Sequence, residues 1–226
     1  MLILLLEKLK LKIKNFASES IILLLKLFFT IFLSCFSSIL VAETMPEDVI
    51  SMITTEILDE IKNKPELARG DLRSVNELVE KKVMPILDFE KMTALAVGKK
   101  WKKATDIQKK TLMKSFRKLL LLSYSGTIKF AEQAKVKILP PRRGLGDKKA
   151  VVKTRVSFPG RQAVPINYRM KLTEDGWKIY DLNVLGLWLV DNYRVQFSQI
   201  VNAQGIEGLI NQIDQKNRKL LGGSNS

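Results

Sequence analysis

Two periodicities divide most of the chain. From residue 46 to about residue 134, apolar side chains recur every three or four positions, which is typical of amphipathic helices. From residue 135 to 184 the period changes to two, which indicates strands with one apolar and one polar face. The helical period then returns and is interrupted at Gly205. This order predicts an α+β fold, in which a curved antiparallel sheet of about four strands is wrapped by N- and C-terminal helices.

Local signals predict where the elements end. Ser74 and Thr105 are each followed by Glu or Gln three residues later, so each is expected to begin a helix as part of a capping box. The helix after Thr105 is expected to reach about Ala134, with a kink near residues 123–126. The pairs Pro159-Gly160 and Asp175-Gly176 separate three strands of a meander. Residues 136–139 are expected to add a strand at one edge.

Composition restricts the chemistry. The 226 residues include no His and one Cys, which excludes His-based acid–base catalysis, His-assisted nucleophiles and His-rich or Cys-rich zinc sites. The Ser115-Phe116-Arg117-Lys118 match to Ser-x-x-Lys lacks the companion motifs of that enzyme class. We therefore expect no enzyme, no catalytic residues, no metal and no cofactor. With 38 Lys+Arg against 23 Asp+Glu, the net charge of +15 favours an anionic partner.

The N-terminal segment suggests which anionic partner the protein meets. A basic region at Lys8, Lys10, Lys12 and Lys14 precedes residues 27–41, which carry no charge and end at Ala42. This pattern predicts a signal peptide over residues 1–42, a single domain over 43–221 and a flexible tail over 222–226. An uncleaved anchor, or lipoprotein processing at Cys35, is the alternative. Because an exported protein rarely meets nucleic acid, we expect none as a partner, and a membrane is the better candidate.

Apolar periodicity does not distinguish a packed core from a lipid cavity. A packed core and the lining of a lipid cavity both require apolar side chains at the same positions. The aromatic residues of the chain fit either interpretation.

Several short motifs occur in a fixed order along the chain. The main ones are Pro85-Ile86-Leu87-Asp88-Phe89, Gly98-Lys99-Lys100-Trp101, Gly176-Trp177-Lys178-Ile179-Tyr180-Asp181 and Asn192-Tyr193-Arg194 with Gln196-Phe197. In this order they resemble the MlaC family of periplasmic phospholipid-shuttle proteins, also called toluene-tolerance proteins. The resemblance covers nearly all of residues 46–216. One departure is Trp188, which stands where the family usually has Ser.

The resemblance implies a fold similar to that of NTF2-like proteins, with an apolar cavity that holds the acyl chains of a phospholipid. It implies a periplasmic monomer that carries phospholipid between an outer-membrane complex containing MlaA and an inner-membrane ABC transporter containing MlaD, and so maintains outer-membrane lipid asymmetry. The rival classes are an exported enzyme and an exported basic scaffold with a solid core that docks on anionic membranes. The candidate lining residues are Phe89, Met92, Trp101, Phe116, Leu120, Tyr124, Val152, Val156, Ile166, Tyr168, Met170, Ile179, Leu187, Val190, Tyr193 and Phe197.

Overall fold

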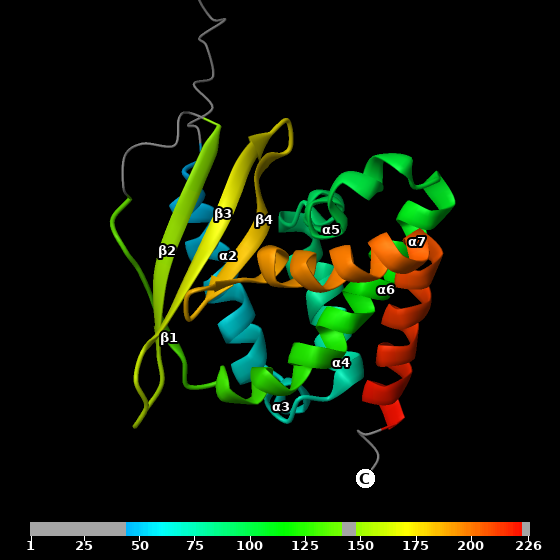
Figure 1. The fold of residues 1–226 in the computed structure, drawn as a ribbon. Helices are drawn as coiled ribbons and strands as arrows, with labels where there is room; N and C mark the ends of the chain where they lie inside the picture. Colours follow the sequence, from blue (N-terminus) through cyan, green and yellow to red (C-terminus); the bar gives the residue numbers. More distant parts are fainter. Residues whose placement is uncertain (1–43, 142–147, 223–226) are drawn as a thin grey trace, which may run out of the picture. The chain divides into compact units, whose positions relative to one another are not determined.

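The computed structural model describes residues 44–141 and 148–222, and its elements follow the predicted order of helices, sheet and helices (Figure 1). The α+β prediction is confirmed, with a fifth, two-residue strand beyond the four expected. The predicted signal peptide and residues 223–226 of the predicted tail lie outside the described residues, whereas Gly222, the first residue of that tail, belongs to the C-terminal helix.

In the described residues, the helical first half contains five α-helices joined by short segments of other helix types. The α-helices are α2 (Pro46–Asn63), α3 (Pro65–Ala68), α4 (Leu72–Leu78) and α5 (Phe89–Val97), followed after a turn by α6 (Asp106–Tyr124). The joining turns are η1 (Val79–Val83), η2 (Met84–Ile86), η3 (Gly98–Lys103) and η4 (Ser125–Phe130).

Side-chain caps fix several helix starts. The Thr105 hydroxyl accepts the backbone N–H of Gln108 at 3.2 Å, and the Gln108 side chain accepts the N–H of Thr105 at 3.0 Å, which confirms the predicted capping box. The prediction at Ser74 is wrong, because α4 begins at Leu72 and Asp71 is its N-cap. The Asp71 carboxylate takes the N–H of Ser74 at 2.9 Å, so Ser74 is a first-turn residue instead of the cap.

The sheet is an antiparallel meander in the order β1-β2-β3-β4-β5. Its strands are β1 (Lys135–Ile138), β2 (Lys149–Ser157), β3 (Val164–Thr173), β4 (Gly176–Val184) and β5 (Leu187–Trp188). The strand register defines an inner face, which carries Val152, Thr154, Val156, Ile166, Tyr168, Met170, Ile179, Leu182 and Val184. The outer face carries Lys149, Val151, Lys153, Arg169, Lys171, Lys178 and Asp181.

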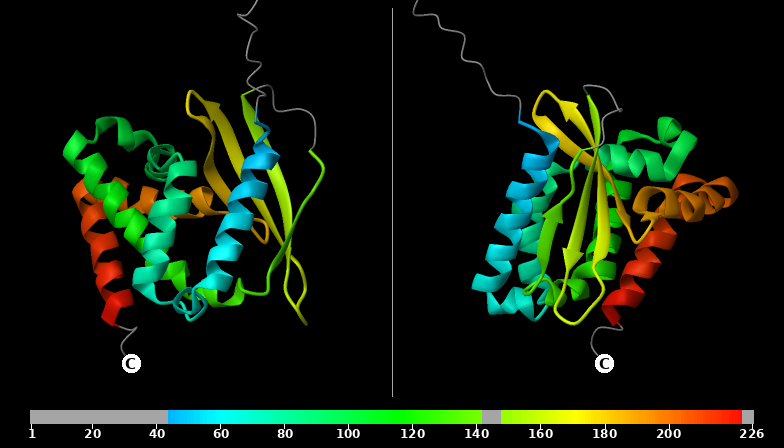
Figure 2. Two further views of the ribbon diagram at one scale, coloured as in Figure 1. Left: turned by 180° about the vertical axis from the view of Figure 1, so that it is seen from behind. Right: turned by 90° about the vertical axis from the view of Figure 1, so that its left-hand side faces the viewer.

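Helix α2 covers part of the inner face. Val49 and Ile50 of α2 form one buried cluster with Val152, Met170 and Ile179 of the sheet. In Figure 1 the helix lies behind the strands, and in the reverse view of Figure 2 it lies in front of them. The apolar period of α2 and the alternation of β2 and β3 are therefore explained by the same contact.

A second core forms mainly among the helices. Phe116 of α6 lies 5.8 Å from Phe89 of α5, and 4.9 Å and 5.1 Å from Tyr193 and Phe197 of α7 (Leu189–Gly222), measured between ring centroids. The two contacts with α7 are edge-to-face, a favourable arrangement for aromatic rings. The aromatic side chains of α5, α6 and α7 thus pack against one another.

Helix α7 changes direction at Gly205, as its interrupted period predicts. Gly205 has φ 69° and ψ −171°, a conformation that essentially only glycine adopts. Buried side chains occur on both sides of it, including Phe197 and Val201 before it and Leu209 and Ile213 after it. Within residues 44–141 and 148–222, no helix combines the length and the hydropathy needed to cross a membrane.

Candidate functional site

Half of the sixteen candidate lining residues belong to the helical core. These eight residues pack among α5, η3, α6 and α7. The strand that contacts their cluster is β4. It comprises Phe89, Met92, Phe116, Val190, Tyr193 and Phe197, which are buried, and Trp101 and Leu120, which are partly buried against them.

The sheet holds six other candidates, all on the inner face. Their exposure differs along the strands. Val152, Met170 and Ile179 are at most 3% exposed beneath α2, and Val156 is buried as well. Tyr168 and Ile166 are only half-buried. The inner face therefore has a closed half under α2 and a more open half toward the start of β3 and the end of β4.

Two of the sixteen candidates are exposed in the structure. Tyr124 is 48% exposed because it is the last residue of α6, where the helix gives way to the 3₁₀ turn η4. Leu187 is 73% exposed because the chain reverses between β4 and β5 through Leu185 and Gly186, both with positive φ. Periodicity could not show that either position falls at an element end.

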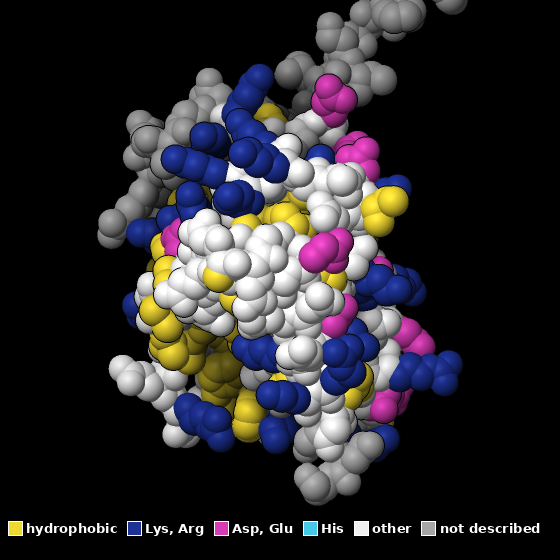
Figure 3. Space-filling model, turned by 45° about the vertical axis from the view of Figure 1, so that its right-hand side comes forward, with side chains coloured by type: hydrophobic (Ala, Val, Ile, Leu, Met, Phe, Trp, Pro, Cys, Tyr) yellow, Lys and Arg dark blue, Asp and Glu magenta, His cyan; other side chains and the backbone are white. Residues whose placement is uncertain are grey.

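The open half of the inner face forms the candidate site, which we term the apolar recess. It consists of Ile166, Tyr168, Leu182 and Val184, and burial falls across it until Val184 is 44% exposed. Leu185 and Leu187 continue the apolar surface on the β4–β5 turn. Figure 3 shows hydrophobic side chains inside a hollow on one side of the molecule.

Exposed apolar side chains concentrate in two segments of the chain, and one of these segments continues the recess. Five of the nine large hydrophobic side chains that the described structure exposes lie in two short segments, residues 124–130 and 184–187. Clustered exposed apolar residues mark binding sites more often than single ones do. The sequence signal that could have identified the second segment is the apolar run 184–190 around Gly186, which is too continuous for a solvated hairpin.

Two tyrosine hydroxyls near these residues are neutral. Burial, together with the neighbouring Tyr124, raises the pKa of Tyr193 to about 12, and its hydroxyl lies within hydrogen-bonding reach of Tyr124 and Ser123. Burial also raises the pKa of Tyr168, whose hydroxyl contacts Thr154. Both phenols stay uncharged at neutral pH. A surface with apolar walls and a few hydroxyls suits an uncharged hydrocarbon ligand.

A buried acid connects this region to α7. The Asp181 carboxylate is 2.8 Å from the Arg169 guanidinium and accepts the N–H of Val190 at 3.0 Å. Burial raises the pKa of Asp181, although the donated N–H groups of Val190 and Leu182 act in the opposite direction. The Arg169 guanidinium also lies 3.8 Å from the Trp188 ring centroid. The network fixes the entry of α7 beside the recess, and sequence reasoning did not identify it.

Two surface depressions lie elsewhere. One of about 620 Å³ is bordered by α4, α6 and the end of α7, with Leu72, Leu121 and Leu122 among its walls. Another of about 260 Å³ lies between residues 129–133 and the β2–β3 turn, where Lys129 and Arg161 both approach the Phe130 ring. No cluster of three metal-ligating side chains occurs among the residues that the structure describes.

Comparisons with known proteins agree on one family. A family model described as MlaC protein matches residues 52–215. The chain is 22% identical to the toluene tolerance protein ttg2D of Pseudomonas putida, with 77% of this chain and 81% of the relative covered. It is 23% identical to the intermembrane phospholipid transport system binding protein MlaC of Haemophilus influenzae, with 84% and 93% covered.

A solved structure is similar as well. The phospholipid-binding protein from Ralstonia solanacearum, in complex with a phospholipid, superimposes with a TM-score of 0.76 at 31% sequence identity. The similarity covers 79% of this chain and 99% of that protein.

Proposed function

The chain belongs to the MlaC family, and on that premise we propose that it is a periplasmic phospholipid carrier that holds the acyl chains against the open half of its sheet. The observation that carries this proposal is the apolar recess of Ile166, Tyr168, Leu182 and Val184, in a fold similar to that of a phospholipid-bound protein. The headgroup would stay at the mouth of the recess, in contact with water.

The physical requirement for such a carrier is strong. Two acyl chains with about 16 methylenes each, at about 0.8 kcal/mol per methylene, represent about 25 kcal/mol of hydrophobic free energy. A phospholipid therefore does not cross an aqueous compartment without an apolar surface to hold its chains. The neutral hydroxyls of Tyr168 and Tyr193 add no charge that would oppose this binding.

The family relationship supports a protein that carries phospholipid between two membranes, and it does not assign a direction of transport. The proposed partners are an outer-membrane complex containing MlaA and an inner-membrane ABC transporter containing MlaD. Residues 1–42 would direct export and be removed after Ala42. The role is binding and transport, without catalysis, and it would serve the lipid asymmetry of the outer membrane.

The lining of the cavity is proposed to include more than the open recess. Acyl chains would separate the two cores, so that helical-core residues such as Phe116, Tyr193 and Phe197 face the lipid when it is bound. Such separation is feasible because the closed sheet cluster and the helical core are distinct clusters in the structure.

Mass spectrometry of solvent extracts tests the proposal. Protein purified from the periplasm without detergent should release phospholipid, and an unrelated exported protein prepared in parallel should not. Extracts in which the two proteins carry equal traces would favour the alternative of an exported basic scaffold with a solid core.

A further inference from the structure

Three lysines form a row on the outer face of the sheet. Lys149 of β2 is paired in register with Lys171 of β3, and Lys171 is paired with Lys178 of β4. Adjacent strands are about 4.8 Å apart, so the three side chains leave the same face as close neighbours. Like charges directly opposite each other destabilise a sheet. The three paired lysines therefore destabilise the sheet unless a negatively charged group binds them.

Two further lysines enlarge the row into a basic surface. Lys91 of α5 lies with its ammonium 4.4 Å from the Tyr180 ring centroid, and Lys148 precedes β2. Burial lowers the pKa of Lys91, and the neighbouring charges of Lys171 and Lys149 lower it further. Lys91, Lys149 and Lys171 are thus close enough to repel one another.

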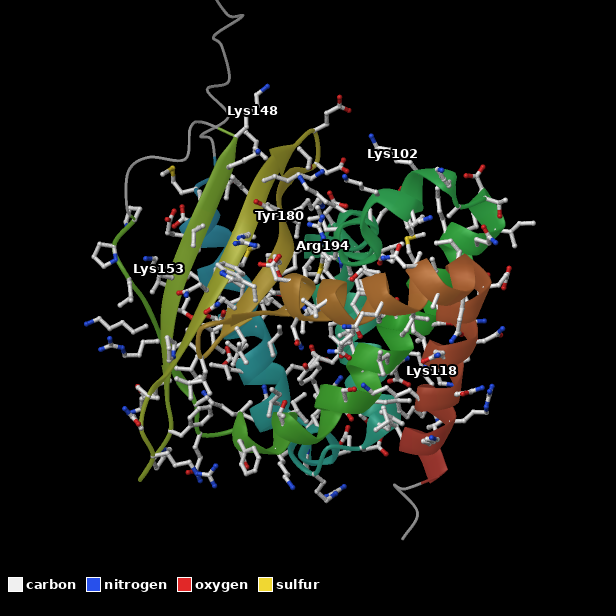
Figure 4. All side chains as sticks on the ribbon, in the orientation of Figure 1. Lys102, Lys118, Lys148, Lys153, Tyr180 and Arg194 are labelled. Atoms are coloured by element: carbon white, nitrogen blue, oxygen red, sulfur yellow. The ribbon has the colours of Figure 1, made fainter. Side chains whose placement is uncertain are left out.

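The protein itself neutralises little of this charge. Within the part of the chain that the structure describes, Lys171 is the one member of the set that forms an ion pair, with Asp88. Lys178 donates to the carbonyl of Pro85 at 2.8 Å, a neutral acceptor. Figure 4 places Lys148 at the upper end of β2, and Figure 3 shows a group of Lys and Arg side chains at the upper left of the face in view.

The side-chain chemistry distinguishes between an acidic protein and an anionic membrane as the partner. Protein interfaces are depleted in Lys and are centred on buried aromatic or Arg residues. The aromatic ring at this surface, Tyr180, is instead half-buried and covered by Lys91. Clustered lysines without an apolar anchor are typical of surfaces that attract anionic lipid headgroups.

We propose that the basic surface formed by Lys91, Lys148, Lys149, Lys171 and Lys178 docks the protein on anionic phospholipid bilayers. This inference rests on the proposed carrier function, since a carrier must meet the membrane that supplies or receives its lipid. The lysine row and the recess lie on opposite faces of the sheet, and Figure 3 shows basic side chains and a hollow with apolar side chains from one side of the molecule. Docking would bring the mouth of the hollow near the headgroups.

Vesicle co-sedimentation tests the proposal with two double variants of equal charge change. Lys148→Ala/Lys149→Ala alters two exposed positions of the basic surface, and Lys216→Ala/Lys219→Ala alters two exposed positions on α7. The vesicles are phosphatidylcholine alone or phosphatidylcholine mixed with phosphatidylglycerol. Circular dichroism checks that both variants remain folded.

The unmodified protein, purified from the periplasm, should bind the phosphatidylglycerol vesicles and not the neutral ones. Binding should disappear near 1 M salt, where the Debye length is about 3 Å. Since a lysine near an anionic surface contributes about 1 kcal/mol, or about five-fold, the Lys148/Lys149 variant should partition about thirty-fold less. The α7 variant should stay within a factor of about two of the unmodified protein.

Equal losses in both variants, or binding that ignores phosphatidylglycerol, would overturn the proposal. So would a protein that leaves vesicles untouched but binds an acidic protein through Lys148 and Lys149. The phospholipid content of the same samples separates the two hypotheses. Lipid-loaded protein that ignores vesicles refutes docking alone, and vesicle binding by protein that never carries lipid refutes the carrier function alone.

Discussion

Asp88 and Lys171 form an ion pair that joins the N-terminus of α5 to β3. The same carboxylate accepts the backbone N–H of Lys91 at 3.0 Å, so Asp88 is also the N-cap of α5. One side chain thus fixes a helix start and connects it to the sheet. Its sequence position, directly after Pro85-Ile86-Leu87, gives no sign of the pairing with a strand more than eighty residues later.

Replacing Asp88 should separate these two contributions. Asp88→Ala removes both the cap and the ion pair and should lower the free energy of unfolding by about 1–2 kcal/mol. Asp88→Asn keeps a cap acceptor and should cost less, about 1 kcal/mol or below, because the pair is partly exposed to solvent. Urea titrations measure both values. Equal costs for the two variants would show that the cap contributes nothing.

The ion pair also predicts a dependence of stability on pH. Burial alone would raise the pKa of Asp88, but the Lys171 ammonium and the N–H of Lys91 outweigh it and hold the pKa below its ordinary value of 3.8. Ionised Asp88 therefore stabilises the fold above pH 3.8, and this stabilisation is lost as the pH falls through the lowered pKa. The difference in stability between the unmodified protein and Asp88→Asn should shrink on acidification. A difference that is the same at pH 3 and pH 7 would contradict the assignment.

Gly205 should be required for its backbone conformation and not for space. A Cβ at Gly205 would meet no atom within 4 Å, yet its φ of 69° with ψ of −171° is strained for any other residue. Gly205→Ala should therefore lower the free energy of unfolding by about 1–3 kcal/mol. Gly126→Ala is the matched control, since Gly126 has equal space and no positive φ. Thermal unfolding that ranks the two variants equally would remove the backbone explanation.

Much of the fold could be predicted because its signals are local. The Thr105 capping box, the two hairpin turns and the break at Gly205 each depend on a few neighbouring residues and on backbone sterics. The start of α4 was misplaced because Asp71 and Ser74 both qualify as caps, and only tertiary structure decides between them.

The candidate site was less predictable because periodicity reports that a side chain is buried without reporting its partner. Phe116 and Val152 have the same apolar pattern, yet one packs among helices and the other against α2. The long-range pairing of lysines across β2, β3 and β4 likewise depends on register, which single strands do not reveal.

The two halves of the inner face should respond differently to a new carboxylate. Val152 is 1% exposed beneath α2, so Val152→Glu buries an unpaired charge and should destabilise the protein by several kcal/mol. Val184, at 44% exposure, lies where water can reach. Val184→Glu should therefore fold normally and lose most of its bound phospholipid, because the carboxylate would repel the acyl chains.

Tyr168→Glu, at a half-buried position of the same recess, should also lose lipid, while Arg155→Glu on the exposed outer side of β2 should keep it. Circular dichroism and the phospholipid content of purified protein are measured on all four variants. Val184→Glu and Tyr168→Glu proteins that are folded and carry a normal lipid load would exclude the open half of the inner face as the binding surface. The carboxylate of Arg155→Glu does not face the recess. Loss of lipid from this variant as well would therefore show that added negative charge lowers the lipid load wherever it is placed, and not through contact with the acyl chains.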